Sequence, residues 1–400
     1  MEKQKNIPQL RFREFSQSWE EKKLGEIGSF FSGGTPLTSK RSFYSGDIPF
    51  IRSGEIHSDM TEMFISEEGF NNSSAKMIEV GDLIYALYGA TSGEAGISQI
   101  NGAINQAILC IRTNLDNRFL LNYLDLNKEN ILATYIQGGQ GNLSAEIIKS
   151  LFIPITELKE QQKIASFLTA VDEKIQALKK KKTVLEQYKK GIVQKLFSQE
   201  LRFQDDEGND FPKWEMKKLG EVLIEHKLKS SSKEEVYSVS VHKGLINQIE
   251  HLGRSFAAEN TDNYNLVQPN DIVYTKSPTG DFPFGIIKQS KIQKPVIVSP
   301  LYGVFTPESK GLGYLLNVYF ESPLNVANYL GSLIQKGAKN TINITNSTFL
   351  SKKMNLPISI DEQEKIGDFL FALDEKINRA EKQIQQTQAW KKGLLQKMFV

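Results

Sequence analysis

Residues 160–197 read EQQKIASFLTAVDEKIQALKKKKTVLEQYKKGIVQKLF and contain no proline. A row of apolar residues recurs in this stretch at every seventh position: Ile164, Val171, Leu178, Leu185 and Ile192. A second row follows members of the first by four residues: Leu168, Ile175 and Leu196. Spacings of three, four and seven place side chains on one stripe of a helix. A stripe kept over about five heptads is typical of a coiled coil. We therefore predict one long helix here, paired through the first row.

The pattern occurs a second time, because residues 361–400 read DEQEKIGDFLFALDEKINRAEKQIQQTQAWKKGLLQKMFV. A shift of 202 residues, from Asp172 to Asp374, brings the motif Asp-Glu-Lys-Ile of the first copy onto the same motif of the second. Two helices of equal length with matching stripes predict a partner in each other. The pairing residues predicted in the second helix are Ile366, Leu373, Ile377, Ile384 and Leu394.

A shorter segment ahead of each long helix is also repeated. Residues 10–27 and 201–222 both begin Leu-Arg-Phe, and both reach Trp-Glu-x-Lys-Lys-Leu-Gly-Glu, at Trp19 and Trp214. Repeats of solenoid proteins are about 20–50 residues long, so a repeat of this length indicates a duplicated domain instead. We predict an α+β fold with a globular domain at 1–155, a long helix at 156–200, a second globular domain at 201–358 and a second long helix at 359–400.

Composition excludes several classes of protein. Forty per cent hydrophobic and 24% charged residues are ordinary globular values. The single cysteine, Cys110, cannot form an internal disulfide and fits a reducing compartment. The beginning of the chain lacks the apolar core of a signal peptide, and no run approaches 18 apolar residues. We therefore expect a cytoplasmic protein without a membrane partner. A net charge of +2 neither indicates nor excludes nucleic acid, because local patches matter more.

The globular domains read as short strands with one helical region each. In the first we predict strands at 47–51, 82–87, 103–111 and 151–155, and a helix at 118–135. In the second we predict strands at 271–274, from 295, and at 354–358, with a helix within 315–333. The order of these elements is kept while the residues differ. That is expected if the common frame binds one kind of partner and the variable parts read two different targets.

Several motifs together resemble one known family. They are Ile-Pro-Ile or Leu-Pro-Ile before each long helix, Glu-Gln-x-Lys-Ile, Phe-Leu and Asp-x-Lys-Ile within it, and Trp-x-x-x-x-Leu-Gly ahead of each domain. The first domain adds the segments Ser32-Gly33-Gly34-Thr35-Pro36, Gly46–Ile51 and Val80–Ile84. In this combination and order, the chain resembles the specificity subunit of type I restriction–modification enzymes over nearly its whole length.

The resemblance implies both a fold and a function. The fold is two duplicated α/β target-recognition domains separated by two long antiparallel coiled-coil helices. Each domain would read one half of a bipartite sequence in double-stranded DNA, and the helices would set the spacer between the halves. Two methyltransferase (modification) subunits would dock on the frame, and restriction subunits would join them. The chain itself would bind no cofactor, since S-adenosylmethionine, ATP and Mg²⁺ are expected on the partner subunits.

Candidate DNA contacts are polar residues next to the predicted strands and in glycine-rich loops. Arg and Lys suit guanine, Asn and Gln suit adenine, and small hydroxyls and backbone amides suit phosphates. In the first domain they are Thr35, Lys40, Arg41, Tyr44, Arg52, Ser53, Tyr88, Thr91, Ser92, Gln140 and Asn142. In the second domain they are Lys227, Lys229, His242, Lys243, Arg254, Lys276, Ser277, Lys339 and Asn340. The second domain departs from the family pattern, because residues 227–233 replace the Gly-Gly-Thr-Pro loop.

Two other functions are alternatives to this one. A DNA methyltransferase or endonuclease would need its own active site. However, residues 281–284 (Asp-Phe-Pro-Phe) only approach the Asn/Asp-Pro-Pro-aromatic loop of amino-methyltransferases, and Asp172-Glu173-Lys174 lies in the predicted coiled coil. The four histidines lack metal-ligand spacing, so no catalytic or metal residue is predicted. A coiled-coil adaptor without DNA binding would show no steep dependence of DNA affinity on salt.

Overall fold

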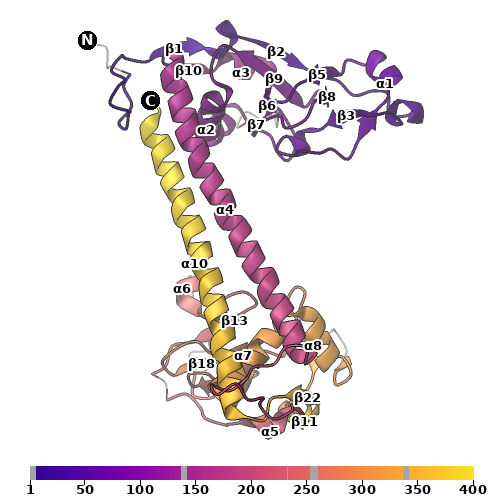
Figure 1. Cartoon of the computed structure of the whole chain (residues 1–400), viewed down its shortest axis with the longest axis vertical. Helices are drawn as coiled ribbons and strands as arrows, with labels where there is room; N and C mark the ends of the chain where they lie inside the picture. The colour runs from indigo at the N-terminus through magenta and orange to yellow at the C-terminus, as the bar shows by residue number, and fades with distance from the viewer. Residues whose placement is uncertain (1–5, 137–141, 232, 253–259, 337–341) are drawn as a thin grey trace. The chain divides into compact units, whose positions relative to one another are not determined.

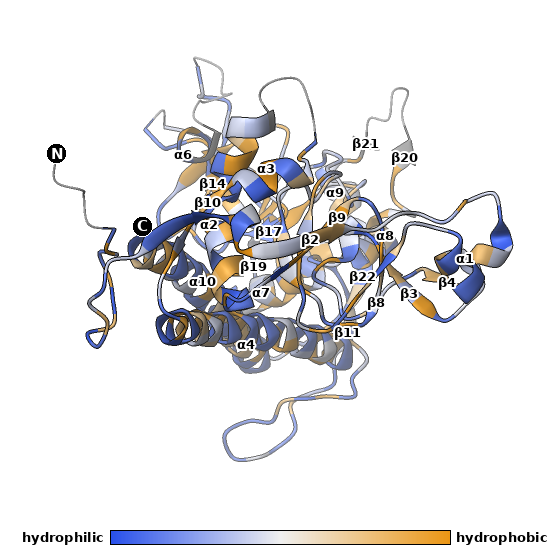
Figure 2. Cartoon of the chain, turned by 90° about the horizontal axis from the view of Figure 1, so that it is seen from above, coloured by the Kyte–Doolittle hydropathy of each residue, from blue (hydrophilic) through white to orange (hydrophobic). Residues whose placement is uncertain are grey.

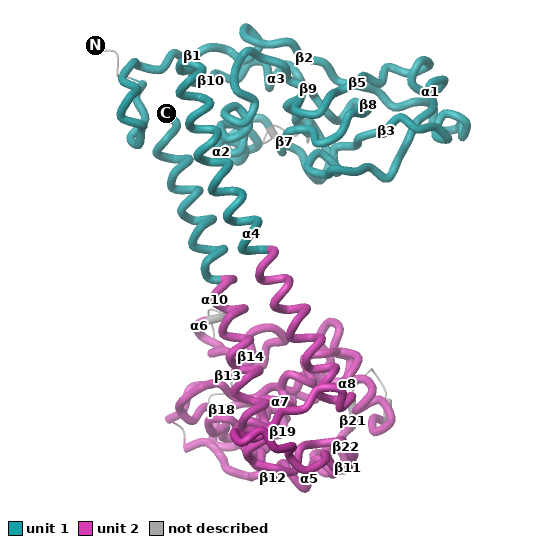
Figure 3. Tube along the Cα trace, in the orientation of Figure 1, with its two compact units in different colours: residues 1–179, 382–400 teal, residues 180–381 magenta. Residues whose placement is uncertain are grey.

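The computed structural model describes residues 6–136, 142–231, 233–252, 260–336 and 342–400. The chain divides into two compact units (Figure 3). Unit 1 comprises Met1–Lys179 and Lys382–Val400, and unit 2 comprises Lys180–Glu381. Each unit therefore contains one globular block and a segment of each long helix. The helix segments are part of the compact units.

The two long helices confirm the prediction from the repeated stretches (Figure 1). They are α4 (Leu158–Phe197) and α10 (Ile360–Met398). Figure 2 shows mostly hydrophilic residues along α4. Of the predicted pairing residues, six are buried: Ile164, Val171, Ile366, Leu373, Ile384 and Leu394. Four are only half-buried: Leu178, Leu185, Ile192 and Ile377.

The helix segments run antiparallel inside each unit. In unit 2, Lys189 Nζ lies 2.7 Å from Asp374 Oδ1, and Lys182 Nζ lies 2.8 Å from Glu381 Oε2. The residue number therefore falls along α4 as it rises along α10. In unit 1 the duplicated positions form the reciprocal pair, with Lys391 Nζ 2.7 Å from an oxygen of Asp172.

Unit 1 is built on a four-stranded antiparallel sheet of order β2-β9-β6-β7. A second sheet has the order β4-β3-β8-β5, in which only β3 and β8 are parallel, and β1 pairs with β10. Its elements are β1 (Glu20–Lys23), η1 (Leu24–Glu26), β2 (Gly28–Ser32), η2 (Arg41–Tyr44), β3 (Ile48–Ile51), η3 (Ser53–Glu55), β4 (Phe64–Ile65), α1 (Glu67–Asn71), β5 (Lys76–Ile78), β6 (Leu83–Ala86), β7 (Ala95–Ile97), β8 (Gly102–Ile104), β9 (Ile108–Thr113), α2 (Asn117–Ile136), α3 (Ala145–Ser150) and β10 (Phe152–Ile155).

Unit 2 repeats this plan, with the sheet β12-β19-β16-β17 and the pair β11-β22. In place of the second sheet it has the pairs β13-β14, β15-β18 and β20-β21. Its elements are β11 (Glu215–Lys218), α5 (Leu219–Val222), β12 (Leu223–Glu225), β13 (Tyr237–Ser240), β14 (Gly244–Asn247), α6 (Gln248–Leu252), β15 (Asn265–Val267), β16 (Ile272–Tyr274), β17 (Ile287–Gln289), β18 (Val296–Val298), β19 (Gly303–Pro307), α7 (Lys310–Tyr319), α8 (Pro323–Leu330), β20 (Gln335–Lys336), β21 (Ile342–Asn343), α9 (Asn346–Ser351) and β22 (Lys353–Leu356).

In both units, successive side chains of the central strand pack into hydrophobic clusters on opposite faces of the sheet. In β6, Tyr85 joins the cluster under α2, whereas Ile84 joins the cluster shared with the second sheet. In β16, Tyr274 joins the cluster that contains α7, whereas Val273 packs towards β13–β14 and β15–β18. Successive side chains of a strand point to opposite faces, so a central strand buried on both faces is apolar throughout.

A buried carboxylate joins each block to the beginning of its long helix. Glu160 accepts hydrogen bonds from Trp19 Nε1 at 3.1 Å and from two Arg11 nitrogens at 2.7 and 2.8 Å. In unit 2, Glu362 accepts one from Trp214 Nε1 at the same distance of 3.1 Å. Both carboxylates are fully buried, and burial of a charge requires such partners. The repeated Trp-Glu contact explains why the tryptophan and the Glu-Gln motif recur together.

Two predictions from the sequence were wrong in detail. The predicted strand 103–111 is two strands, β8 and β9, which lie in different sheets. Asn105 breaks the run, because its Oδ1 accepts a hydrogen bond from the amide of Ala107 and its carbonyl accepts one from Ile108. The predicted helix within 315–333 is two helices, since Ser322 caps α8 and Pro323 occupies its first turn. The helix predicted at 118–135 is confirmed as α2.

Candidate nucleic-acid interface

Four loops of unit 1 meet at one end of the main sheet. β2 and β6 both pair antiparallel with β9, so their carboxyl ends lie at the same edge. The amide of Gly33 donates to Asn105 O at 3.2 Å, and the amide of Leu87 donates to Ala107 O at 2.8 Å. We call residues 33–36, 52–54, 87–92 and 105–107 the polar edge of unit 1.

Six of the predicted contacts lie on this polar edge: Thr35, Arg52, Ser53, Tyr88, Thr91 and Ser92. Thr91 Oγ1 donates to Ser53 O at 2.9 Å, which ties the loop after β6 to the loop after β3. Thr35 Oγ1 donates to Gln106 Oε1 at 2.6 Å. Burial raises the pKa of Tyr88, and a hydrogen bond with Gln106 partly offsets this effect.

Gln106 is not among the contacts predicted from the sequence, because the run around it reads as a single strand. The structure places it in the turn between β8 and β9, where it is exposed and contacts both Thr35 and Tyr88. A glutamine amide can pair with the edge of adenine. The paired polar residues Asn105 and Gln106 inside an apolar run were the signal that could have indicated a turn.

The predicted residues Lys40, Arg41 and Tyr44 belong to the segment that follows the first loop. Tyr44 Oη donates to Pro36 O at 2.6 Å and holds this segment against the polar edge. Lys40 Nζ lies 4.6 Å from the centre of the Phe43 ring. Lys40 and Arg41 are both exposed, so their charges face solvent.

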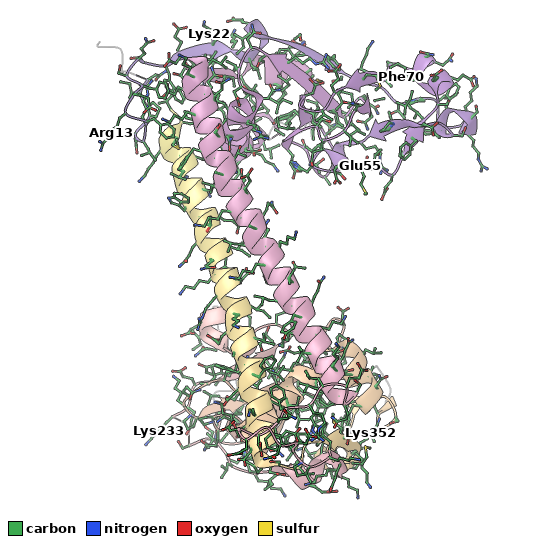
Figure 4. All side chains as sticks on the ribbon, in the orientation of Figure 1. Arg13, Lys22, Glu55, Phe70, Lys233 and Lys352 are labelled. Atoms are coloured by element: carbon green, nitrogen blue, oxygen red, sulfur yellow. The ribbon has the colours of Figure 1, made fainter. Side chains whose placement is uncertain are left out.

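Arg52 is held by two carboxylates. Its guanidinium donates to Glu55 at 2.9 Å and to Glu62 at 2.8 Å, beside a cleft of about 390 Å³ that these residues line with Gly54. Figure 4 labels Glu55 in this cluster. Burial by itself would raise the pKa of Glu55, but Arg52 and two backbone amides outweigh it and hold the pKa at about 2. The charge of Arg52 is therefore offset within the protein, unlike that of Arg41.

The loop before α3 also reaches the polar edge. The amide of Leu143 donates to Leu87 O at 2.9 Å, which brings the exposed Asn142 next to the loop after β6. The predicted residue Gln140 lies outside the described residues.

In unit 2 the corresponding loops follow β12 and β16. Lys227 and Lys229 follow β12 and are exposed, and Lys229 Nζ donates to Asn263 O at 3.0 Å and to Asn265 Oδ1 at 2.7 Å. Lys276 and Ser277 follow β16, and Lys276 has a positive φ of 55°. Burial lowers the pKa of Lys276, and the charge of Glu225 acts in the opposite direction.

The remaining predictions of unit 2 are more scattered. His242 and Lys243 are exposed in the turn between β13 and β14, where the amide of Lys243 donates to Ser240 Oγ at 3.3 Å. Val241 of the same turn packs against the hydrophobic cluster that contains Phe282 and Ile286, which follow β16. Arg254, Lys339 and Asn340 lie outside the described residues.

An acidic residue positions the central strand in each unit. Asp82 lies before β6, and Arg112 donates to its two oxygens at 2.9 and 2.6 Å. Burial by itself would raise the pKa of Asp82, but the Arg112 guanidinium outweighs it and lowers the pKa. Asp271 lies before β16 and accepts from Thr306 Oγ1 at 2.8 Å, with His226 Nε2 also 2.8 Å away. The strand is thus held in both units, but by different partners.

The described residues contain no group of three or more His, Cys, Asp or Glu side chains that could hold a metal ion. No helix among them is long and apolar enough to cross a membrane.

Comparison with known proteins agrees with the geometry. The family model described as the type I restriction modification DNA specificity domain matches residues 16–187 and 212–387. The MjaVIII specificity subunit of Methanocaldococcus jannaschii is 23% identical, over 98% of this chain and 95% of that protein. The MjaIX specificity subunit of the same organism is 24% identical, over 64% of this chain and 63% of that relative, which is less than two thirds of its length.

A solved structure shows the same fold. The S subunit of a type I restriction–modification system from M. genitalium matches with a TM-score of 0.60 at 17% identity, over 98% of this chain and 99% of that one. Because the family model matches most of the chain in two segments, the chain belongs to the family of type I restriction–modification DNA specificity domains and carries two copies of the domain.

Proposed function

We propose that this chain selects the DNA sequence on which a type I restriction–modification complex acts. Each globular block reads one half of a bipartite sequence in double-stranded DNA, docking in a major groove. The observation that carries the proposal is the duplicated frame with different loop residues. The same sheet order and the same Trp-Glu contact occur in both units, whereas the loops that carry Thr35 and Tyr88 in unit 1 carry Lys227, Lys229 and Lys276 in unit 2.

The frame itself holds the partners. Two methyltransferase subunits dock on the long helices and bring S-adenosylmethionine and the catalytic residues. Restriction subunits then add the ATP- and Mg²⁺-dependent steps, and the chain is a non-catalytic specificity subunit without a cofactor of its own. Tyr188 of α4 and Trp390 of α10 support two equivalent docking positions, since they are 202 residues apart and 51% and 49% exposed. Half-exposed aromatic residues are typical anchors of protein interfaces.

The helices also set the spacer between the two half-sites. Reciprocal pairs such as Lys189 with Asp374 and Lys391 with Asp172 support a fixed register between α4 and α10. A helix of fixed register is a rigid spacer, because each residue adds about 1.5 Å along its axis.

The test is the pattern of DNA methylation in cells that carry the methyltransferase subunit of the same system, with and without this chain. We expect a bipartite motif with a fixed spacer that appears only when the chain is present. Methylation that is the same without the chain would contradict the proposal and favour an enzyme that selects its own sites. A complex that assembles but methylates no motif would favour an adaptor without DNA specificity.

A further inference from the structure

The two central strands can be aligned residue by residue. Gly81 and Asn270 both have a positive φ, of 97° and 69°, immediately before the acidic residues Asp82 and Asp271. Tyr85 and Tyr274 then occupy the same face of β6 and β16, in the clusters under α2 and α7. Counted from the two acids, Leu87 of unit 1 corresponds to Lys276 of unit 2.

The frame accepts an ordinary core residue at this position. Leu87 is buried in the cluster under α2, its amide donates to Ala107 O, and its carbonyl accepts from the amide of Leu143. A leucine therefore meets every structural demand of the position in unit 1. The fold therefore does not require a lysine at this position in unit 2.

The backbone of Lys276 is held in a conformation that lysine disfavours. Its φ of 55° lies in the left-handed region, where a side chain meets the backbone. The preceding residue, Thr275, is bonded in both directions to Ile286: its amide donates to Ile286 O, and its Oγ1 accepts from the amide of Ile286 at 3.0 Å. A Cβ on Gly285 would lie 3.0 Å from the amide nitrogen of Lys276, so this loop packs against it closely. Strain of this kind is concentrated at functional sites.

The ammonium group has no partner within the described residues. No hydrogen bond or ion pair to Lys276 exists there, in contrast to Lys229, whose ammonium donates to Asn263 and Asn265. Lys276 is also half-buried, whereas Lys227 in the neighbouring loop is exposed. A charged group that has lost part of its water without gaining an acceptor is unfavourable in the free protein. An acceptor supplied by a ligand would recover that loss.

We propose that Lys276 is a specificity-determining residue, whose ammonium donates to the acceptor edge of a guanine, O6 and N7, in the half-site read by unit 2. This inference rests on the proposed function. The choice of a base over a phosphate follows from the geometry. A phosphate anchor needs only charge near the backbone of the DNA, which exposed lysines such as Lys227 supply. A lysine held by a strained, closely packed loop presents its donors at a defined point, as reading of guanine requires.

The first experiment maps methylation in cells that carry the methyltransferase subunit with the wild-type chain or with Lys276→Met. Methionine keeps the length of the side chain and removes the charge. We expect the methylated motif to lose its requirement for guanine at one position of a single half-site, while the other half-site and the spacer stay the same. An unchanged motif would overturn the inference, and so would a uniform fall in methylation at all sites. If the wild-type chain directs no motif, the proposed function fails instead, so the two failures are distinguishable.

A second variant separates recognition from stability. Glycine adopts a positive φ without strain, so Lys276→Gly should raise the melting temperature of the chain and still relax the same guanine. A glycine variant that keeps the wild-type motif would show that the lysine has no role in reading DNA. Lys227→Met is the matched control. We expect it to weaken DNA binding evenly across sequences and to lower the slope of log affinity against log salt by about 1, with the motif unchanged.

Discussion

The two units hold the same pair of helices in different ways. In unit 1, Lys391 and Asp172 form an ion pair whose side chains are 20% and 45% exposed. In unit 2, the side chains of the duplicated pair, Lys189 and Asp374, are only 11% and 15% exposed. A buried pair needs further partners, and Glu321 supplies one at 2.8 Å from Lys189 Nζ. Duplication has therefore kept the pair and changed its surroundings.

The contacts between the globular block and the long helices also differ between the two units. Trp19, Phe119 and Phe399 cluster where the globular block of unit 1 packs against the long helices, with ring centres 5.0 to 6.0 Å apart. In unit 2, Gly311 of α7 and Gly367 of α10 let the backbones touch, since a Cβ on Gly367 would lie 2.4 Å from Gly311 Cα. The comparison teaches that the same arrangement of strands and helices accepts either aromatic packing or close backbone contact between glycines, provided that the residues on both sides of the contact fit each other.

The largest expected effect comes from exchanging the residues of this helix contact. Gly367 corresponds to the buried Ala165 of unit 1, 202 residues earlier. We expect Gly367→Ala to destabilise unit 2 by about 3 kcal/mol, because the new methyl group meets backbone atoms that cannot move aside. Ala165→Gly should cost unit 1 only about 1 kcal/mol, through the lower helix propensity of glycine.

Hydrogen exchange of peptides from α7 and α2 measures these two changes separately, and denaturant unfolding gives their size. Equal losses in the two variants would contradict the view that close backbone contact is special to unit 2. A gain in stability for Gly367→Ala, as expected of a solvent-exposed helix, would contradict the contact itself.

Removal of the lysine from each reciprocal pair should have a smaller effect. Lys189→Met leaves the carboxylate of Asp374, which is only 15% exposed, without its cation, whereas Glu321 keeps Lys288 at 3.7 Å. We expect a loss of about 2 kcal/mol. Lys391→Met removes a partly exposed pair, and its loss should stay below about 1 kcal/mol. Urea unfolding of both variants provides the comparison. The interpretation of a buried network in unit 2 would be wrong if the two losses were the same.

The smallest effect is expected in the loop residues that distinguish the two blocks. The pKa of Glu55 is about 2, below the ordinary value of 4.5, so the charged carboxylate stabilises the fold above pH 4.5 and this contribution disappears as the pH falls towards 2. Glu55→Gln should therefore lose about 1 kcal/mol at pH 7, a value reduced by the partial exposure of Arg52, and almost nothing near pH 2.

Unfolding by urea between pH 2 and pH 7 tests this dependence. Glu62→Gln is the matched control, because Glu62 also bonds Arg52 but its side chain is 84% exposed. We expect a nearly flat difference from the wild type for the control. A pH dependence of the same size in both variants would show that Glu55 is not special within the cluster.

The limits of prediction from the sequence can be seen in particular residues. Heptad spacing predicted both long helices, because a stripe of apolar residues is a local property of the chain. It did not predict that Leu178 and Leu185 are only half-buried while Lys189 is buried, because burial depends on what packs against each turn. Loop residues such as Thr35 and Tyr88 were predicted as a set, but their meeting point, Gln106, was hidden in a run that reads as a strand.

The sequence by itself determined the duplication, the two long helices and the family, since these follow from periodicity and from motifs repeated at a constant distance. Only the tertiary structure decided which residues act together. The reciprocal Lys–Asp pairs and the backbone contact of Gly311 with Gly367 join segments far apart in the chain. Such contacts depend on how elements distant in the sequence pack against each other, and a local pattern of residues does not specify that packing.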